Sequence, residues 1–150
     1  MIKSERSEYS GSLSVDTVEK REIKFQSDSG RIRETSSKIL KDISCHGLGD
    51  STAFGIKLCI EEAVRNAIVH GNKSDPRRQV RISYWVKDGV FNIEIEDDGK
   101  GFDHEAVKDP TKEENLLRNS GRGVYLIKKL MDNVRYNEAG NKISMSKKIK

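Results

Sequence analysis

Apolar residues recur at helical spacing in three stretches of the chain. In residues 31–44 and 50–71 they fall three and four positions apart, which places them on one face of an α-helix. We expect the second of these helices to begin with Asp50-Ser51-Thr52 as its N-cap and to end at Gly71 as its C-terminal glycine. The same spacing predicts a third amphipathic helix over residues 121–132.

Elsewhere apolar and polar residues alternate, which predicts half-buried strands. Residues 80–86 and 91–97 alternate on either side of Asp88-Gly89, a two-residue hairpin signal. Residues 21–26 are expected to form a short first strand, and a second hairpin is expected between residues 134 and 149. Because these strands favour hairpins, we predict an α+β fold whose sheet is mixed or antiparallel and is covered by helices on one face.

Length and composition are those of one folded domain. The 150 residues suffice for a sizeable core, and the polar residues 1–20, which show no sustained period, are expected to form a flexible leader before a domain over 21–150. No apolar run approaches the length of a membrane span, and the N-terminus lacks the apolar stretch of a signal peptide. We therefore expect a cytoplasmic protein that does not contact membranes.

Charge and cysteine content argue against nucleic-acid binding and a metal cluster. The 28 basic and 24 acidic residues are interspersed outside the tail 147–150, whereas a nucleic-acid binder usually concentrates its basic residues and interleaves aromatic ones. We expect no direct contact with nucleic acid. Cys45 and Cys59 lack metal-ligand spacing, so both are expected to be reduced thiols.

One edge of the second predicted helix carries polar residues that could share a ligand. Glu62 and Asn66 are four residues apart, so their side chains lie on one edge of the helix, with His70 one turn further along. Asn66 offers a carbonyl oxygen suited to Mg²⁺, and Glu62 could orient or deprotonate a nucleophile beside that metal. The alternative is a solvated flank with no specific role.

Asp97 continues the apolar face of its strand, where a carboxylate is costly to bury without donors. An acceptor at the bottom of an apolar pocket is what an aromatic ring that carries an amino group would use. Gly99 and Gly101 would let the backbone approach such a ring closely. The alternative is a turn that only ends the strand, because aspartate and glycine are favoured there for backbone reasons.

The glycines of Gly121-Arg122-Gly123 precede the last predicted helix, whose free N–H groups and dipole could bind an anion. Arg118, Arg122 and Lys112 stand nearby as possible phosphate ligands. A hinge after the long connection 102–120 would explain the glycines equally well.

Taken together, these motifs resemble those of the GHKL ATPase superfamily. Its ordered boxes appear as Glu62-Ala63-Val64-Arg65-Asn66-Ala67 with His70-Gly71-Asn72, then Asp97-Asp98-Gly99-Lys100-Gly101, then Gly121-Arg122-Gly123. The likeness spans about residues 20–150 and is greatest to the small anti-sigma factor serine kinases of the RsbW and SpoIIAB type. It implies a Bergerat α/β sandwich, with a mixed, mostly antiparallel sheet and helices packed on one face, that binds ATP and Mg²⁺.

The resemblance also implies roles for individual residues. Glu62 would be the general base, Asn66 the Mg²⁺ ligand, and Asp97 the acceptor for the adenine amino group. Residues 102–120 would act as a lid. Further contacts to the nucleotide and its phosphates would come from His70, Gly99, Gly101, Arg118, Gly121, Arg122 and Gly123.

One position departs from the family pattern. In the family an arginine just before the serine of the last box helps to bind phosphate, and this chain has Asn119 there. The nearest basic residues are Arg118 and Arg122, so the phosphate contact is expected to differ in this chain.

The function implied by the resemblance is that of an ATP-dependent serine-protein kinase. It would phosphorylate an anti-anti-sigma partner with a STAS domain and also regulate a sigma factor, and the resemblance favours a homodimer. The alternative is a non-catalytic switch, in which the same fold binds ATP, ADP or no nucleotide and only holds a regulatory partner.

Overall fold

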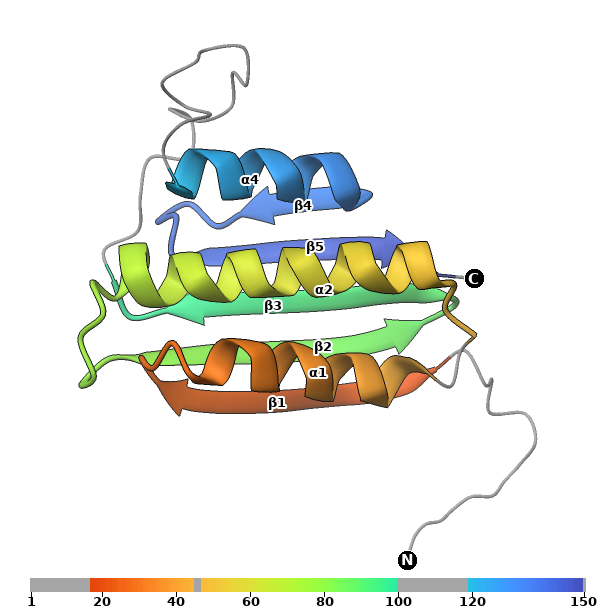
Figure 1. Cartoon of the computed structure of the whole chain (residues 1–150), viewed down its shortest axis with the longest axis horizontal. Helices are drawn as coiled ribbons and strands as arrows, with labels where there is room; N and C mark the ends of the chain where they lie inside the picture. Colours follow the sequence, from red (N-terminus) through yellow and green to blue (C-terminus); the bar gives the residue numbers. More distant parts are fainter. Residues whose placement is uncertain (1–16, 45–46, 100–118, 150) are drawn as a thin grey trace, which may run out of the picture.

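A five-stranded sheet forms one layer of the fold, and helices cover one of its faces (Figure 1). The computed structural model describes residues 17–44, 47–99 and 119–149. In this part of the chain the strand order is β1-β2-β3-β5-β4 and each pairing is antiparallel. The strands are β1 (Val18–Gln26), β2 (Gln79–Lys87), β3 (Val90–Asp97), β4 (Asn133–Tyr136) and β5 (Lys142–Lys148). The predicted α+β fold is confirmed, and its sheet is antiparallel rather than mixed.

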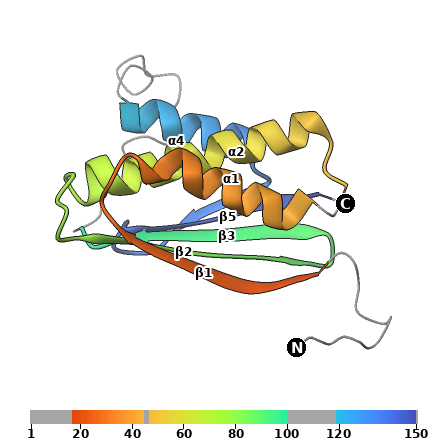
Figure 2. The ribbon, with the colours of Figure 1, turned by 60° about the horizontal axis from the view of Figure 1, so that its bottom comes forward.

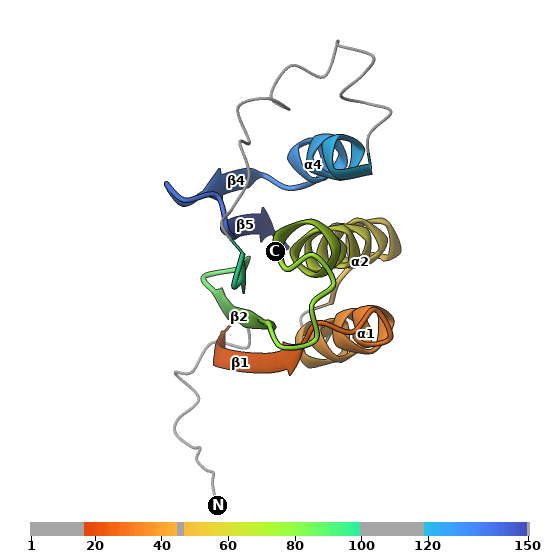
Figure 3. The ribbon, with the colours of Figure 1, turned by 90° about the vertical axis from the view of Figure 1, so that its left-hand side faces the viewer.

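The helices lie side by side on the sheet, with α2 between α1 and α4 (Figures 2 and 3). They are α1 (Arg31–Ile43), α2 (Asp50–Arg65) and α4 (Asn119–Leu130), and α2 continues directly into a π-helical segment, η3 (Asn66–Gly71). None of the helices in the described ranges is long and apolar enough to cross a membrane.

Buried and partly exposed residues alternate along the central hairpin, β2–β3, as the sequence predicts. Antiparallel register sets Ile82 opposite Ile95 and Val80 opposite Asp97, so each pair points to the same face of the sheet. That face is covered by the apolar side of the helices. The buried hydrophobic residues of β2, β3 and α2 are Val80, Ile82, Tyr84, Val86, Phe91, Ile93, Ile95, Ile56, Cys59, Ile60, Ala63 and Val64. Asp97 ends this apolar row and is only 7% exposed.

The ends of the second helix differ from the sequence expectation. Gly49 is the N-cap and Asp50 is the first helical residue, where its charge faces the positive end of the helix dipole. Gly71 does not adopt a left-handed conformation. Instead the last turn widens, and the Asn72 N–H donates to the carbonyl of Ala67, five residues earlier.

Two other elements begin earlier than expected. Strand β1 starts at Val18, inside the stretch predicted as a flexible leader. Helix α4 starts at Asn119, so Gly121, Arg122 and Gly123 lie within the helix rather than before it, with Gly123 as its fifth residue. Most of the predicted leader and of the predicted lid lies outside the described residues.

A buried amide ties three parts of the chain together at the end of η3. Asn72 is fully buried, and its Nδ2 donates to Ser27 Oγ at 2.9 Å and to the carbonyl of Gln79 at 3.0 Å. Its Oδ1 accepts the Asp98 N–H at 2.8 Å. Because donor and acceptor are both satisfied, the amide can be buried without the penalty of an unpaired polar group. It fixes the ends of β1, β2 and β3 relative to η3.

Replacing Asn72 by alanine should therefore lower the free energy of unfolding by about 2–4 kcal/mol, because it leaves buried partners unsatisfied. Asn133→Ala is the matched control, since the Asn133 side chain is exposed and donates to Ser146 Oγ at 3.3 Å. The control should change the stability by less than about 0.5 kcal/mol. Urea unfolding of both variants measures this, and equal effects would contradict the role given to Asn72.

Candidate functional site

A cavity of about 210 Å³ lies beside the C-terminal half of α2, between η3 and the ends of β3, β4 and β5. Its apolar wall comes from both layers of the fold and includes Ala63, Ala67, Ile95 and Ile143. Its polar lining is formed by Asn66, His70, Lys73, Asp97, Tyr136, Asn141 and Lys142. A mostly apolar cavity with a few polar groups is typical of a small-molecule site.

Asp97 is the buried acid of this cavity. The Gly99 N–H donates to its Oδ1 at 2.8 Å, and no other described residue is seen to donate to the carboxylate. Burial raises the pKa of Asp97 to about 6, although the Gly99 N–H acts in the opposite direction. The carboxylate can therefore still accept a hydrogen bond from a ligand, and its burial lowers the stability of the folded protein.

Two glycines make room for this carboxylate. A Cβ on Gly71 would overlap both oxygens of Asp97, and a Cβ on Gly99 would overlap the carbonyl of Gly71. The end of η3 and the end of β3 therefore touch through backbone atoms. Close approach explains both glycines, and neither has a positive φ.

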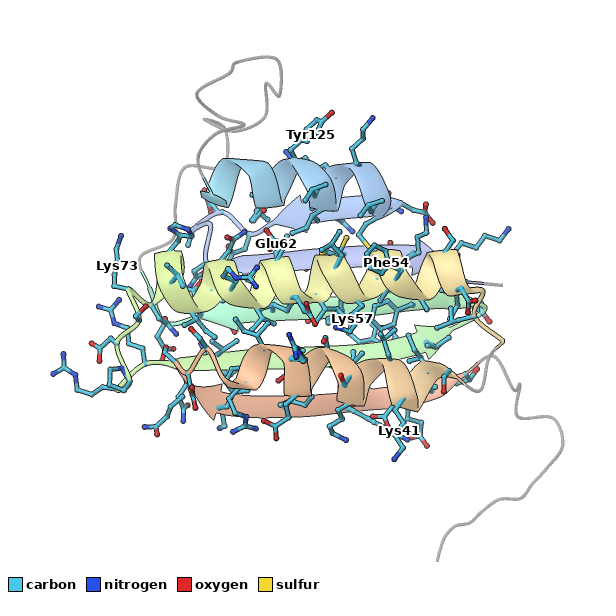
Figure 4. The ribbon with its side chains drawn as sticks, in the orientation of Figure 1. Lys41, Phe54, Lys57, Glu62, Lys73 and Tyr125 are labelled. Carbon is cyan, nitrogen blue, oxygen red and sulfur yellow. The ribbon has the colours of Figure 1, made fainter. Side chains whose placement is uncertain are left out.

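Glu62, Asn66 and Gly123 meet where α2 packs against α4. A Cβ on Gly123 would lie 2.8 Å from Glu62 Oε1 and 3.2 Å from Asn66 Nδ2. Figure 4 shows Glu62 on the side of α2 that faces α4. The two polar side chains therefore share one edge of the helix, as their spacing predicts. The other carboxylate oxygen of Glu62, Oε2, accepts from Arg65 Nη1, three residues along α2.

The structure brings some of the predicted site residues into one place and leaves others undescribed. Asn66, His70 and Asp97 line the cavity, while Glu62 lies one turn before Asn66 at the contact with α4. Gly101 and Arg118 lie outside the described residues. The backbones of Gly121 and Arg122 belong to the first turn of α4.

The predicted position of Gly123 just before a helix is wrong, because Gly123 lies inside α4. As the fifth residue of α4 it follows the turn whose N–H groups lack helical partners. The missing side chain of Gly123 lets α4 approach Glu62 and Asn66.

Several cavity residues were missed by reasoning from the sequence. Tyr136 and Lys142 come from the hairpin β4–β5, and Asn141 pairs with Asp97 through its backbone, the Asp97 N–H donating to the Asn141 carbonyl at 2.9 Å. Burial raises the pKa of Tyr136. Lys73 precedes β2 and has a φ of 55°, which is unusual for a residue with a side chain. The pairing of β5 with β3 and β4 could have signalled Tyr136, Asn141 and Lys142, whereas Lys73 lies outside this hairpin, in the turn before β2.

The close approach of η3 to Asp97 can be tested with two glycine substitutions. Gly71→Ala should lower the free energy of unfolding by more than about 2 kcal/mol, because the new methyl group displaces the carboxylate. Gly55→Ala, in the open middle of α2, should raise it by about 0.5–1 kcal/mol, because nothing lies within 4 Å of its Cβ position. Thermal and urea unfolding measure the stability of both variants. A Gly71→Ala variant that is more stable than the wild type would contradict the close packing of Gly71 against Asp97.

The cost of the buried acid predicts a pH-dependent stability. The pKa of Asp97 in the folded protein, about 6, exceeds its ordinary value of 3.8, so the stabilising contribution of the protonated form is lost as the pH rises to about 6. Asp97→Asn should therefore be more stable than the wild type by about 1–3 kcal/mol at pH 7.5. The difference should shrink as the pH falls from about 6 toward 3.8.

Asp98→Asn is the matched control, because it should change the stability in the opposite direction. The Gln79 N–H and the Arg81 side chain lower the pKa of Asp98, so its charge stabilises the fold above the pKa of the unfolded chain. Asp98→Asn should be less stable than the wild type at pH 7.5. Urea unfolding from pH 4 to 8 measures both variants, and a destabilising Asp97→Asn at pH 7.5 would contradict the assigned burial cost.

The chain is similar in sequence to known proteins. The sequence pattern of the histidine kinase-like ATPase domain matches residues 25–147. The chain is also similar to the serine-protein kinases RsbW of Staphylococcus epidermidis and Staphylococcus aureus, each 38% identical over 102 residues. These alignments take in 63% of this chain and 64% of each relative, so the chain spans slightly less than two thirds of their length. Because the family pattern matches most of the chain, from residue 25 to residue 147, the chain belongs to the histidine kinase-like ATPase domain family.

Proposed function

We propose that the chain binds ATP with Mg²⁺ and transfers its terminal phosphoryl group to a serine of a partner protein. The observation that carries this proposal is the placement of Glu62 and Asn66 on one helix edge that leads into the cavity of Asp97. Membership of the ATPase domain family and the similarity to kinases named RsbW support it.

The cavity fits an adenine ring. Asp97 offers an acceptor for an exocyclic amino group at the end of an apolar row of residues. Ala63 and Ala67 put only small side chains on the helix side of the cavity, which leaves room for a flat ring. Asp97 and its apolar surroundings would therefore select the base.

The helix edge fits a magnesium ion that arrives with the nucleotide. Mg²⁺ is often held by one or two side chains together with phosphate oxygens and water, and Asn66 borders the cavity beside Glu62. The described ranges contain no group of three or more His, Cys, Asp and Glu side chains able to hold a metal by themselves. Asn66 would therefore hold Mg²⁺ jointly with the phosphates, whose charge the ion neutralises.

Glu62 would act as the general base. Its carboxylate would accept the proton of the serine hydroxyl as the hydroxyl oxygen bonds to the terminal phosphorus and the bond from that phosphorus to the bridging oxygen of ADP breaks. Because α2 is packed on the core through Ile60 and Val64, the base sits on a rigid element.

For the partner and the assembly, the proposal rests on the resemblance to anti-sigma factor kinases. The phosphate acceptor would be a STAS-domain anti-anti-sigma protein, the kinase would also regulate a sigma factor, and it would act as a cytoplasmic homodimer. A second candidate function is a switch that binds a nucleotide and holds its partner without phosphorylating it. The ion pair of Glu62 with Arg65 favours the switch, because it occupies an oxygen of the base.

Glu62→Gln separates the two functions. Phosphoryl transfer from radiolabelled ATP to STAS-domain proteins of the same organism should fall by about 10²- to 10⁴-fold, because the amide cannot take the proton. The thermal shift produced by ATP and Mg²⁺ should persist. Glu61→Gln is the control, since Glu61 faces Ser36 and Lys57 and not α4. Transfer that survives in Glu62→Gln would contradict a catalytic base, and no thermal shift in the wild type would contradict nucleotide binding.

A further inference from the structure

The two carboxylate oxygens of Glu62 have different neighbours. Oε1 lies 2.8 Å from where a Cβ on Gly123 would be, and Oε2 accepts from the guanidinium of Arg65. The Glu62 side chain is 19% exposed and the Arg65 side chain is 45% exposed. Arg65 therefore covers Oε2 of a carboxylate that is itself only partly exposed.

The neighbouring pair on the same helix is built differently. Glu61 Oε2 accepts from Lys57 Nζ at 2.5 Å and also from Ser36 Oγ of α1 at 2.6 Å, and Ser36 is fully buried. That second bond anchors Glu61 in the contact between α1 and α2. Among the described residues, no comparable bond anchors the pair of Glu62 and Arg65, so its arginine is free to exchange partners.

The guanidinium of Arg65 has donors to spare. An arginine carries five N–H donors in a planar fork, and one of them serves Glu62 in the described part of the chain. A planar fork matches the oxygens of a phosphate better than it matches one oxygen of a carboxylate. Half exposed at the rim of α2, Arg65 can swing without disturbing the core.

From this arrangement we propose that Arg65 binds the terminal phosphate of ATP, a role that rests on the proposed kinase function. A serine hydroxyl must lie within about 3 Å of Glu62 to lose its proton and at a similar distance from the phosphorus that it attacks. The terminal phosphate is thus one hydroxyl away from Glu62 Oε2, where the Arg65 fork already lies. The chain has Asn119 where the family has an arginine that helps to bind phosphate, and Arg65 would make that contact in its place.

The exchange also controls the base. When Arg65 turns to the phosphate oxygens it releases Glu62 Oε2, which then accepts the serine proton. With ADP there is no terminal phosphate to compete, so Arg65 stays on Glu62 and covers the base. The same side chain would stabilise the charge of the transferred phosphoryl group.

The ratio of ATP to ADP affinity tests this role without any partner protein. Isothermal titration of the wild type, Arg65→Met and Lys57→Met with Mg²⁺ and either ADP or the β,γ-imido analogue of ATP gives the ratio for each. Arg65→Met should weaken binding of the analogue by about 10- to 100-fold, as expected for the loss of charge-assisted hydrogen bonds. Its ADP affinity should change by less than about twofold, and Lys57→Met should change neither affinity, because Lys57 pairs with Glu61, which is bonded to α1, and not with Glu62.

Arg65→Lys is a second variant, which keeps the charge but lacks the planar fork of donors. Its affinity for the ATP analogue should lie between those of the wild type and Arg65→Met. Equal effects of Arg65→Met on ADP and on the analogue, or no effect on either, would overturn the role of Arg65 and leave the kinase proposal standing. A wild type that binds neither nucleotide would instead overturn the proposed function, and the role of Arg65 with it.

Discussion

The backbone contact between Gly71 and Gly99, closed over the carboxylate of Asp97, is the constraint on which the site depends. It brings the end of a helix to the end of a strand that lies 26 residues later, at a distance that no side chain would allow. Asn72 follows directly and holds three strand ends in place with its buried amide. Widening of the last helical turn into η3 places both residues where these contacts form.

Helix α2 supplies both stability and chemistry from different sides. Its inner face carries Ile56, Ile60 and Val64 in the core, and one edge carries Glu62 and continues into Asn66. A side chain on a packed helix keeps its position better than one on a loop, which suits a group that must meet a reacting atom. Arg65 stands on the outer side of the same helix, so its freedom to move costs the core nothing.

Local patterns predicted the parts of the site that lie within single elements. The spacing of Glu62 and Asn66 was sufficient to place them together because a helix has a fixed geometry, and alternation put Asp97 on the buried face of β3 for the same reason. Contacts between distant elements could not be read in this way. Tyr136 and Lys142 enter the cavity because β5 pairs between β3 and β4, and Gly71 touches Asp97 because one turn of helix widens by a residue. The pairing of Arg65 with Glu62 was missed although residues three apart are neighbours on a helix surface, so their spacing allowed it.

Burial of Asp97 makes the protein less stable without a ligand than with one that donates a hydrogen bond to its carboxylate. A ligand that donates a hydrogen bond to Asp97 offsets the cost of its burial, and any ligand bound only by the folded state adds stability in proportion to the logarithm of its concentration. The population of locally opened chains, and hence the rate at which proteases remove them, would then follow the supply of that ligand. In this way a single carboxylate would link the lifetime of the protein to the nucleotide content of its surroundings.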